Sequence, residues 1–201
     1  MSHSPHQDAD LVAGFLAQND IVGLEPDIAL IELAHAVAAI PWGEARLIPE
    51  VLQKGMGTCR GKHRVFLEGC RQLGMEARPV VSTFHWHEEE IQYPKELREF
   101  LEDHHWPQNH TFAQVKNSKD EWIDVDLTWD PPLQPYGFWT FPEDWDGEHP
   151  FRSAKLLERW EGVDIQLKVD EIVNTLTQEQ RQAQDHFMGK FIEWVASLRR
   201  K

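Results

Sequence analysis

One cysteine of this chain stands where its thiol could act as a nucleophile. Residues 55–62 read Gly-Met-Gly-Thr-Cys-Arg-Gly-Lys, and apolar residues then recur at helical spacing up to Gly74. This pattern predicts Cys59 in the first turn of a helix, where free N–H groups and the helix dipole stabilise a thiolate. The alternative is a structural role, because free cysteines are often small core residues.

A thiol nucleophile needs a base to take its proton and a third group to orient that base. His110 is predicted to open a strand, and Asp126 lies in the next strand, beyond a turn at 117–120. Opposite residues of such a hairpin have numbers that sum to about 237, which places His110 roughly across from Leu127, next to Asp126. Asp124 stays an alternative to Asp126 because alternate residues share a strand face.

Four motifs around these residues occur in a fixed order. They are Gly-x-Cys at 57–59, Arg-x-x-Gly-x-x-x-Arg-x-Val at 71–80, a histidine and aromatic at 110–112, and Trp-x-x-x-Asp-x-Thr at 122–128. In this order they resemble the core of the transglutaminase-like superfamily, over residues 28–130. The resemblance implies a papain-like α+β core with a Cys-His-Asp triad.

Carried over by position, the resemblance makes Cys59 the nucleophile, His110 the base and Asp126 the orienting acid. The Trp-x-x-x-Asp spacing favours Asp126 over Asp124. One departure is Phe112, since the family often has Trp two residues after the histidine.

Aromatic residues are the candidates for the oxyanion hole and for substrate binding. Relatives often use an aromatic or polar residue upstream of the cysteine, and Trp42 is its nearest counterpart here. The backbone N–H of Cys59 is a further candidate donor. Trp86 and Trp106, which flank a histidine-rich segment, are additional candidates for the walls of a cleft.

The resemblance implies acyl transfer through a thioester intermediate, without a cofactor. The expected substrate is a peptide or protein amide; water as acceptor gives a hydrolase or peptidase, and an amine gives transamidation. The alternative is a non-catalytic transglutaminase-like module that binds a protein partner, although such copies usually lose a member of the triad.

Residues 85–109 form an acidic insertion between two expected core strands. The segment holds His85, His87, His104 and His105, and it has seven acidic residues against two basic ones. A His-x-His pair can chelate zinc, but the spacing matches no known zinc signature. The expectation is therefore a surface flap without a metal site.

The surrounding elements predict an α+β fold in which N-terminal helices pack on an antiparallel sheet and C-terminal helices follow. The expected units are an N-terminal arm at 1–26, a transglutaminase-like core at 27–150, and a C-terminal helical extension at 151–201 that packs on the core. Helices are expected at 11–17, 26–40, 44–54, 59–73, 94–103 and 164–175. A last helix is expected from Thr177, where Thr177 and Gln180 fit a capping box. Strands are expected at 77–86, 111–115 and 121–129. The residues expected in the core are Phe66, Leu73, Val80, Trp122, Val125 and Leu127.

The composition argues against some classes of binding partner. The formal net charge of -14 argues against nucleic acid and anionic membranes, and no apolar run approaches the length of a membrane span. Cys59 and Cys70 lie about 16 Å apart on one expected helix, too far for a disulfide. Reduced thiols and the lack of a leader-like N-terminal segment predict a cytoplasmic location, and the oligomeric state stays open.

Overall fold

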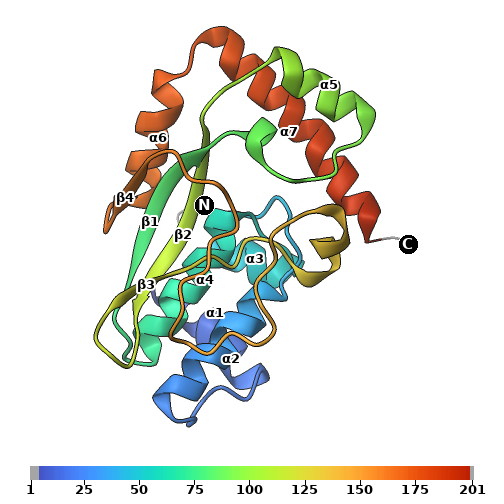
Figure 1. Ribbon diagram of the computed structural model, residues 1–201. Coiled ribbons are helices and arrows are strands. Elements are labelled where there is room, and N and C mark those ends of the chain that lie inside the picture. Colours follow the sequence, from blue (N-terminus) through green and yellow to red (C-terminus); the bar gives the residue numbers. More distant parts are fainter. Residues whose placement is uncertain (1–4, 200–201) are drawn as a thin grey trace.

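The computed structural model describes residues 5–199, and these form an α+β fold around one antiparallel sheet (Figure 1). The sheet has four strands in the order β3-β2-β1-β4. Its strands are β1 (Ala77–Phe84), β2 (Gln108–Lys116), β3 (Trp122–Val125) and β4 (Arg159–Glu161). The predicted fold class is confirmed, while the first four residues of the expected arm lie outside the described part.

Helices precede, interrupt and follow the sheet. They are α1 (Pro5–Gln18), α2 (Pro26–Ala38), α3 (Ile48–Lys54), α4 (Cys59–Gln72), α5 (Lys95–Asp103), α6 (Ile165–Thr175) and α7 (Gln178–Leu198), with short 3-10 turns η1 (Trp86–Glu88) and η2 (Pro131–Tyr136). Local sequence sets several of these ends. Proline occupies the first turn of α2, Gly55 ends α3 in the left-handed conformation, and Thr177 with Gln180 forms the predicted capping box of α7.

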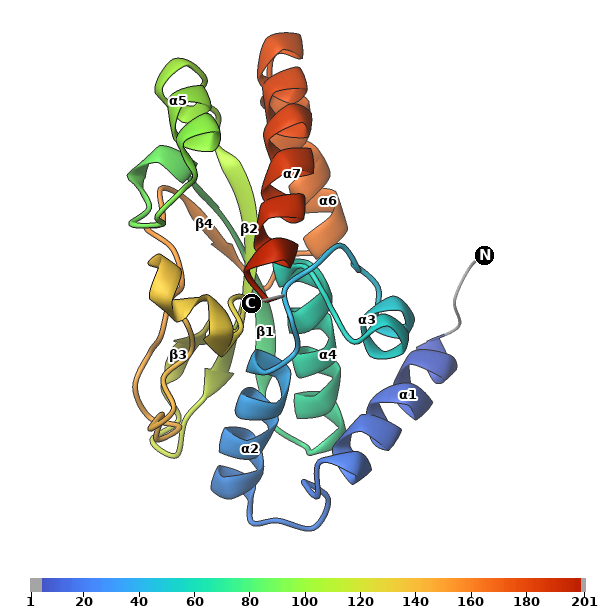
Figure 2. The same cartoon turned by 90° about the vertical axis from the view of Figure 1, so that its right-hand side faces the viewer.

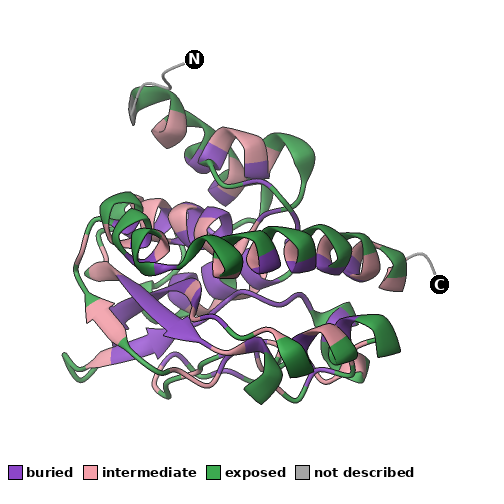
Figure 3. Cartoon of the chain, turned by 90° about the horizontal axis from the view of Figure 1, so that it is seen from above, coloured by how far each residue is buried: buried purple, intermediate pink, exposed green. Residues whose placement is uncertain are grey.

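The sheet separates two groups of elements (Figure 2). Helices α4 and α6 lie on one side of it, while α5, η1 and η2 lie on the other. The first core joins α1, α2 and α4 to the sheet through residues such as Leu33, Phe66 and Val125. The apolar stripe of α7 faces inward and leaves the opposite side exposed (Figure 3).

The second core is aromatic and packs under α7. Phe187 and Phe191 of α7 are fully buried against Trp86, Trp106 and Trp129. This core joins the segment between β1 and β2 to the C-terminal helix. The apolar stripe of α7 therefore packs against other parts of the same chain, as expected of a packing helix.

Several expectations about element bounds were wrong. Helix α1 begins at Pro5 and buries Val12 and Leu16, so the chain is ordered earlier than the expected helix at 11–17. Helix α3 begins only at Ile48, and the short edge strand β4 was not foreseen.

The predicted hairpin differs in its register and in the length of its second strand. Ala113 pairs with Val125 and Gln114 with Asp124, so paired numbers sum to 238. Strand β3 ends at Val125 because the Asp126 side chain accepts the backbone N–H of Thr128, a local bond that competes with pairing.

Four of the six residues expected in the core are fully buried. Leu73 and Trp122 are partly buried, and Leu73 packs against the first core. The Trp122 ring is covered instead by the guanidinium of Arg78, 4.3 Å from its centre. Across residues 5–199, the helices lack the combined length and apolar character needed to cross a membrane.

Candidate active site

The turn that carries Cys59 is fixed to the loop before α3. The N–H of Gly57 donates to Pro41 at 2.9 Å, and the N–H of Thr58 donates to Ala45 at 2.8 Å. Thr58 caps the helix, since its side chain accepts the N–H of Gly61 at 3.2 Å. Gly61 is required here because a Cβ atom would overlap the carbonyl oxygen of Ala45. Cys59 is therefore held as the first residue of α4, as predicted.

His110 lies next to Cys59 and contacts Asp126. It belongs to β2, is 3% exposed, and brings its Nε2 to 2.7 Å from Oδ2 of Asp126. The thiol of Cys59 is hydrogen-bonded to the same ring. Because Nε2 is engaged by the carboxylate, Nδ1 is the ring nitrogen available to the sulfur. The structure thus brings Cys59, His110 and Asp126 into one hydrogen-bonded chain.

Register explains why Asp126 reaches His110. A sum of 238 places His110 and Asp126 on the same sheet face, whereas the predicted sum of 237 would have placed them on opposite faces. Asp124, the competing candidate, is bonded to Gln114 and to the guanidinium groups of Arg152 and Arg159. The structure therefore gives Asp124 structural partners and gives Asp126 the contact with the histidine.

Asp126 is a fully buried carboxylate that is well supplied with donors. Its Oδ1 accepts the Thr128 hydroxyl at 2.6 Å, and its Oδ2 accepts the Ser153 N–H at 3.0 Å as well as His110. Burial alone would raise the pKa of Asp126, but the charge and hydrogen bond of His110 hold that pKa well below its usual range. Asp126 is consequently a fixed negative charge behind the imidazole.

The electrostatics of the pair favour an ionised thiol and a protonated imidazole. Burial raises the pKa of Cys59, but the hydrogen bond and charge of His110, the N–H of Thr111 and the charge of Arg60 outweigh burial and lower the pKa. Burial lowers the pKa of His110, but Asp126 and the thiolate raise it by more. The pKa of His110 therefore lies above its ordinary value. These opposite shifts are those of a thiolate–imidazolium pair.

Two residues to which the sequence analysis assigned no role lie directly behind the site. Lys62 is fully buried, and its ammonium donates to the carbonyls of Ala38 and Thr128, both at 3.0 Å. Burial lowers the pKa of Lys62 to about 7. The signal available in the sequence was a lysine on the inward face of the helix that begins at Cys59.

His63 is the second overlooked residue, four positions after Cys59 and therefore on the same helix face. Its Nδ1 lies 2.7 Å from the carbonyl oxygen of Cys59, and its Nε2 accepts the N–H of Leu127 at 2.9 Å. His63 thus ties the first turn of α4 to the segment that carries Asp126.

A cleft of about 640 Å³ opens over Cys59 and His110. The ends of β1 and β2 line it on one side and α6 and α7 on the other. Of the tryptophans predicted at the site, Trp42 and Trp86 line this cleft, whereas Trp106 is buried and is not among the lining residues. The backbone N–H of Trp42 donates to Asp130 at 2.7 Å, so it is not free to bind an oxyanion.

Gln108 supports the cleft wall and was also overlooked. Its side-chain oxygen accepts the indole N–H groups of Trp86 and Trp106, at 3.2 and 3.0 Å, and the amide of Gln184 from α7 at 3.0 Å. Trp106 thus contributes to the wall from behind. The residues among 5–199 grouped well enough to hold a metal ion are His85, His87 and Glu88.

Comparisons with known proteins agree with this core. Residues 32–127 match the family model described as the transglutaminase-like superfamily, which confirms the resemblance seen in the motifs. No curated protein matches the chain.

Two solved structures are similar at low identity. One is the crystal structure of a TGase, with 13% identity and a TM-score of 0.48, covering 71% of this chain and 36% of that one. The other is a Cytophaga hutchinsonii protein described as a candidate cysteine protease, with 13% identity and a TM-score of 0.41, covering 77% of this chain and 50% of that one. This chain therefore spans no more than half the length of either.

Proposed function

We propose that this protein is a thiol-dependent acyl-transfer enzyme that acts on peptide or protein amides through a thioester intermediate. The observation that carries the proposal is the hydrogen-bonded chain from the Cys59 thiol through His110 to the buried Asp126, at the base of a cleft. The match of residues 32–127 to a transglutaminase-like family model supports the same class of chemistry.

The first half-reaction forms the thioester. The Cys59 proton passes to Nδ1 of His110, and the thiolate attacks the carbonyl carbon of the bound amide. The oxygen of the tetrahedral intermediate becomes negative, and the Cys59 backbone N–H is a candidate donor because the first N–H of a helix has no intrahelical acceptor. The imidazolium then protonates the leaving amine, the C–N bond breaks, and the acyl group stays on the sulfur.

The second half-reaction returns the free thiol. His110 takes a proton from water or from an amine as that nucleophile attacks the thioester carbonyl, and the C–S bond breaks. The departing thiolate regains its position beside the imidazolium. Water yields a carboxylic acid, and an amine yields a new amide. Asp126 holds the imidazole and stabilises its charge throughout.

An activated ester tests this proposal without knowledge of the natural substrate. The purified chain is mixed with p-nitrophenyl acetate at pH 7, and the acetylated residue is identified by mass spectrometry of peptides. We expect one acetyl group on Cys59, unchanged in Cys70→Ser because Cys70 is fully buried, and lost in Cys59→Ser. His110→Ala should slow acetylation by roughly 10²-fold or more.

Adding a primary amine to the same assay then separates the two acceptors. Release of free acetate indicates hydrolysis, and release of acetylated amine indicates transamidation. If Cys59 is acetylated no faster than a small free thiol, and His110→Ala leaves the rate unchanged, the proposed chemistry is wrong, and the binding-module alternative gains support.

A further inference from the structure

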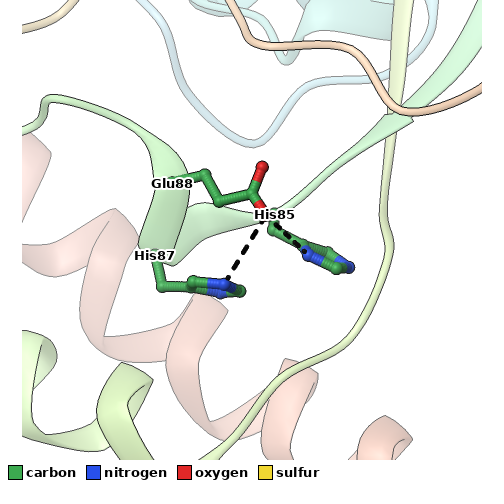
Figure 4. A group of neighbouring side chains, drawn as sticks. All are labelled: His85, His87 and Glu88. Carbon is green, nitrogen blue, oxygen red and sulfur yellow. Dashed lines mark ion pairs between the residues drawn. The ribbon is translucent and has the colours of Figure 1, made fainter.

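We propose that His85, His87 and Glu88 bind a divalent metal ion of the zinc class at the base of the connection between β1 and β2. One donor atom from each of the three residues lies within 4.8 Å of the others. Both imidazoles are directed at the same carboxylate (Figure 4). Two histidines and a glutamate form a donor set that zinc uses in proteins, with a further position left for water or another ligand.

The spacing of the donors fits a shared ion better than direct hydrogen bonds. Nδ1 of His85 lies 3.4 Å from Oε1 of Glu88, and Nε2 of His87 lies 3.8 Å from the same oxygen. Both separations exceed the usual N–H···O range. Tetrahedral zinc with bonds of about 2.0–2.1 Å holds its donors roughly 3.4 Å apart, so only small side-chain movements would complete the coordination.

The backbone beneath these donors is firmly held. Glu88 ends the turn η1, which directly follows β1 and is anchored by the buried Trp86. The indole of Trp86 donates to Gln108, and its carbonyl oxygen accepts the Tyr93 hydroxyl at 3.0 Å. A site on such a rigid segment loses little conformational freedom when it binds an ion.

A further histidine approaches His87 from the other end of the same connection. The His105 ring stacks on His87 with centres 4.1 Å apart. The two ends meet because Phe84 pairs with Gln108 at the last step of the β1–β2 ladder. An ion held by 85–88 and completed by His105 or water would clip the base of this long connection.

The local charge favours a cation, and the site is separate from the proposed triad. The segment 85–109 carries seven acidic residues against two basic ones. Trp86, between the two histidines, lines the cleft over Cys59. The ion would therefore fix a cleft wall, without contact with the reacting thiol.

Calorimetric titration with zinc chloride tests the site independently of any activity. The full chain is used as Cys59→Ser, after treatment with a chelator, so that the one accessible thiol does not compete. We expect saturable binding of one zinc ion at this site. His87→Ala and Glu88→Gln should each weaken the affinity at least tenfold.

The matched control is His149→Ala, which removes an exposed histidine paired with Asp146 elsewhere on the surface. It should leave the affinity unchanged. Because His87 and Glu88 lie at the surface, with side chains 32% and 42% exposed, their variants should keep the thermal midpoint of the metal-free protein. Only the zinc-dependent rise of that midpoint should shrink. Absence of saturable binding, or equal affinities in His87→Ala and His149→Ala, would overturn the proposal.

Discussion

The carboxylate of Asp130 accepts the backbone N–H of Trp42 at 2.7 Å, across 88 positions of the sequence. Asp130 is 1% exposed, and its second oxygen accepts Nε of Arg199 at 2.8 Å, just beyond the end of α7. One buried carboxylate therefore ties the C-terminal helix to the residue that lines the cleft beside Cys59.

The first prediction is that Arg199→Ala destabilises the protein by about 3 kcal/mol, because it leaves a buried carboxylate without its charged partner. The free energy of unfolding in urea measures this. Lys190→Ala is the control, since Lys190 lies on α7 in an exposed pair with Glu96 and should cost little. Equal losses in the two variants would show that the Asp130–Arg199 pair does not stabilise the fold.

The second prediction separates the role of Asp126 from that of Asp124, which lies two residues earlier in the chain. Asp126→Asn removes the charge behind His110, so the thiolate population falls and alkylation of Cys59 by iodoacetamide at pH 6 should slow at least tenfold. Asp124→Asn loosens the contacts with Arg152 and Arg159, so it should lower stability and leave the alkylation rate of the folded protein unchanged. The reverse order of effects would assign the orienting role to Asp124.

The third prediction concerns two pH profiles of Cys70→Ser protein. Alkylation needs only the thiolate, and since the pKa of Cys59 is lowered, its rate should stay high below the ordinary thiol value of about 8.5. Acyl transfer from an amide also needs the proton of His110, whose pKa is raised. The rate of acyl transfer should therefore fall again at alkaline pH, well above pH 6.5, so that its pH profile is bell-shaped. An alkylation midpoint near pH 8.5 would contradict the ion pair.

Local patterns were sufficient to predict most of the elements in this fold. Helix α4 was placed because a glycine-rich turn, a threonine cap and an apolar repeat agree with one another, and α7 because Thr177 and Gln180 form a capping box. The proposed triad was placed from ordered motifs, since these also encode the strand and helix ends that position Cys59, His110 and Asp126.

The features that escaped prediction depend on contacts between distant segments. The one-residue change of register follows from the turn, where the N–H of Asn117 donates to Glu121 and Asp120 adopts the left-handed conformation, which no alternation pattern reveals. Strand β4 is three residues long and forms only against β1. Lys62 and His63 look like ordinary polar helix residues until carbonyl and N–H groups from other segments surround them.

The fourth prediction follows from the hydrogen bonds of His63. Its Nε2 accepts the N–H of Leu127, so the ring must be neutral, with its proton on Nδ1 and donated to the carbonyl of Cys59. Burial lowers the pKa of His63 to about 4. An unfolded chain protonates this residue near pH 6.5. Between those values the unfolded state binds more protons, so the free energy of unfolding must fall as the pH drops.

The size of this contribution is about 3 kcal/mol between pH 6.5 and 4, on top of other groups. His110 adds little slope below about pH 6, because the unfolded imidazole is by then protonated, as it is in the folded state where its pKa is raised. The lowered pKa of Asp126 adds to the loss of stability only below about pH 5, where an unfolded aspartate begins to bind protons. His63→Asn should be less stable at pH 7, since Leu127 loses its acceptor, yet its urea midpoint should vary less with pH than that of the wild type. His149→Asn, at an exposed site, should keep the wild-type dependence of the urea midpoint on pH. If His63→Asn retains it too, the proton that destabilises the fold binds elsewhere, and His63 is not the neutral link between α4 and the Asp126 segment.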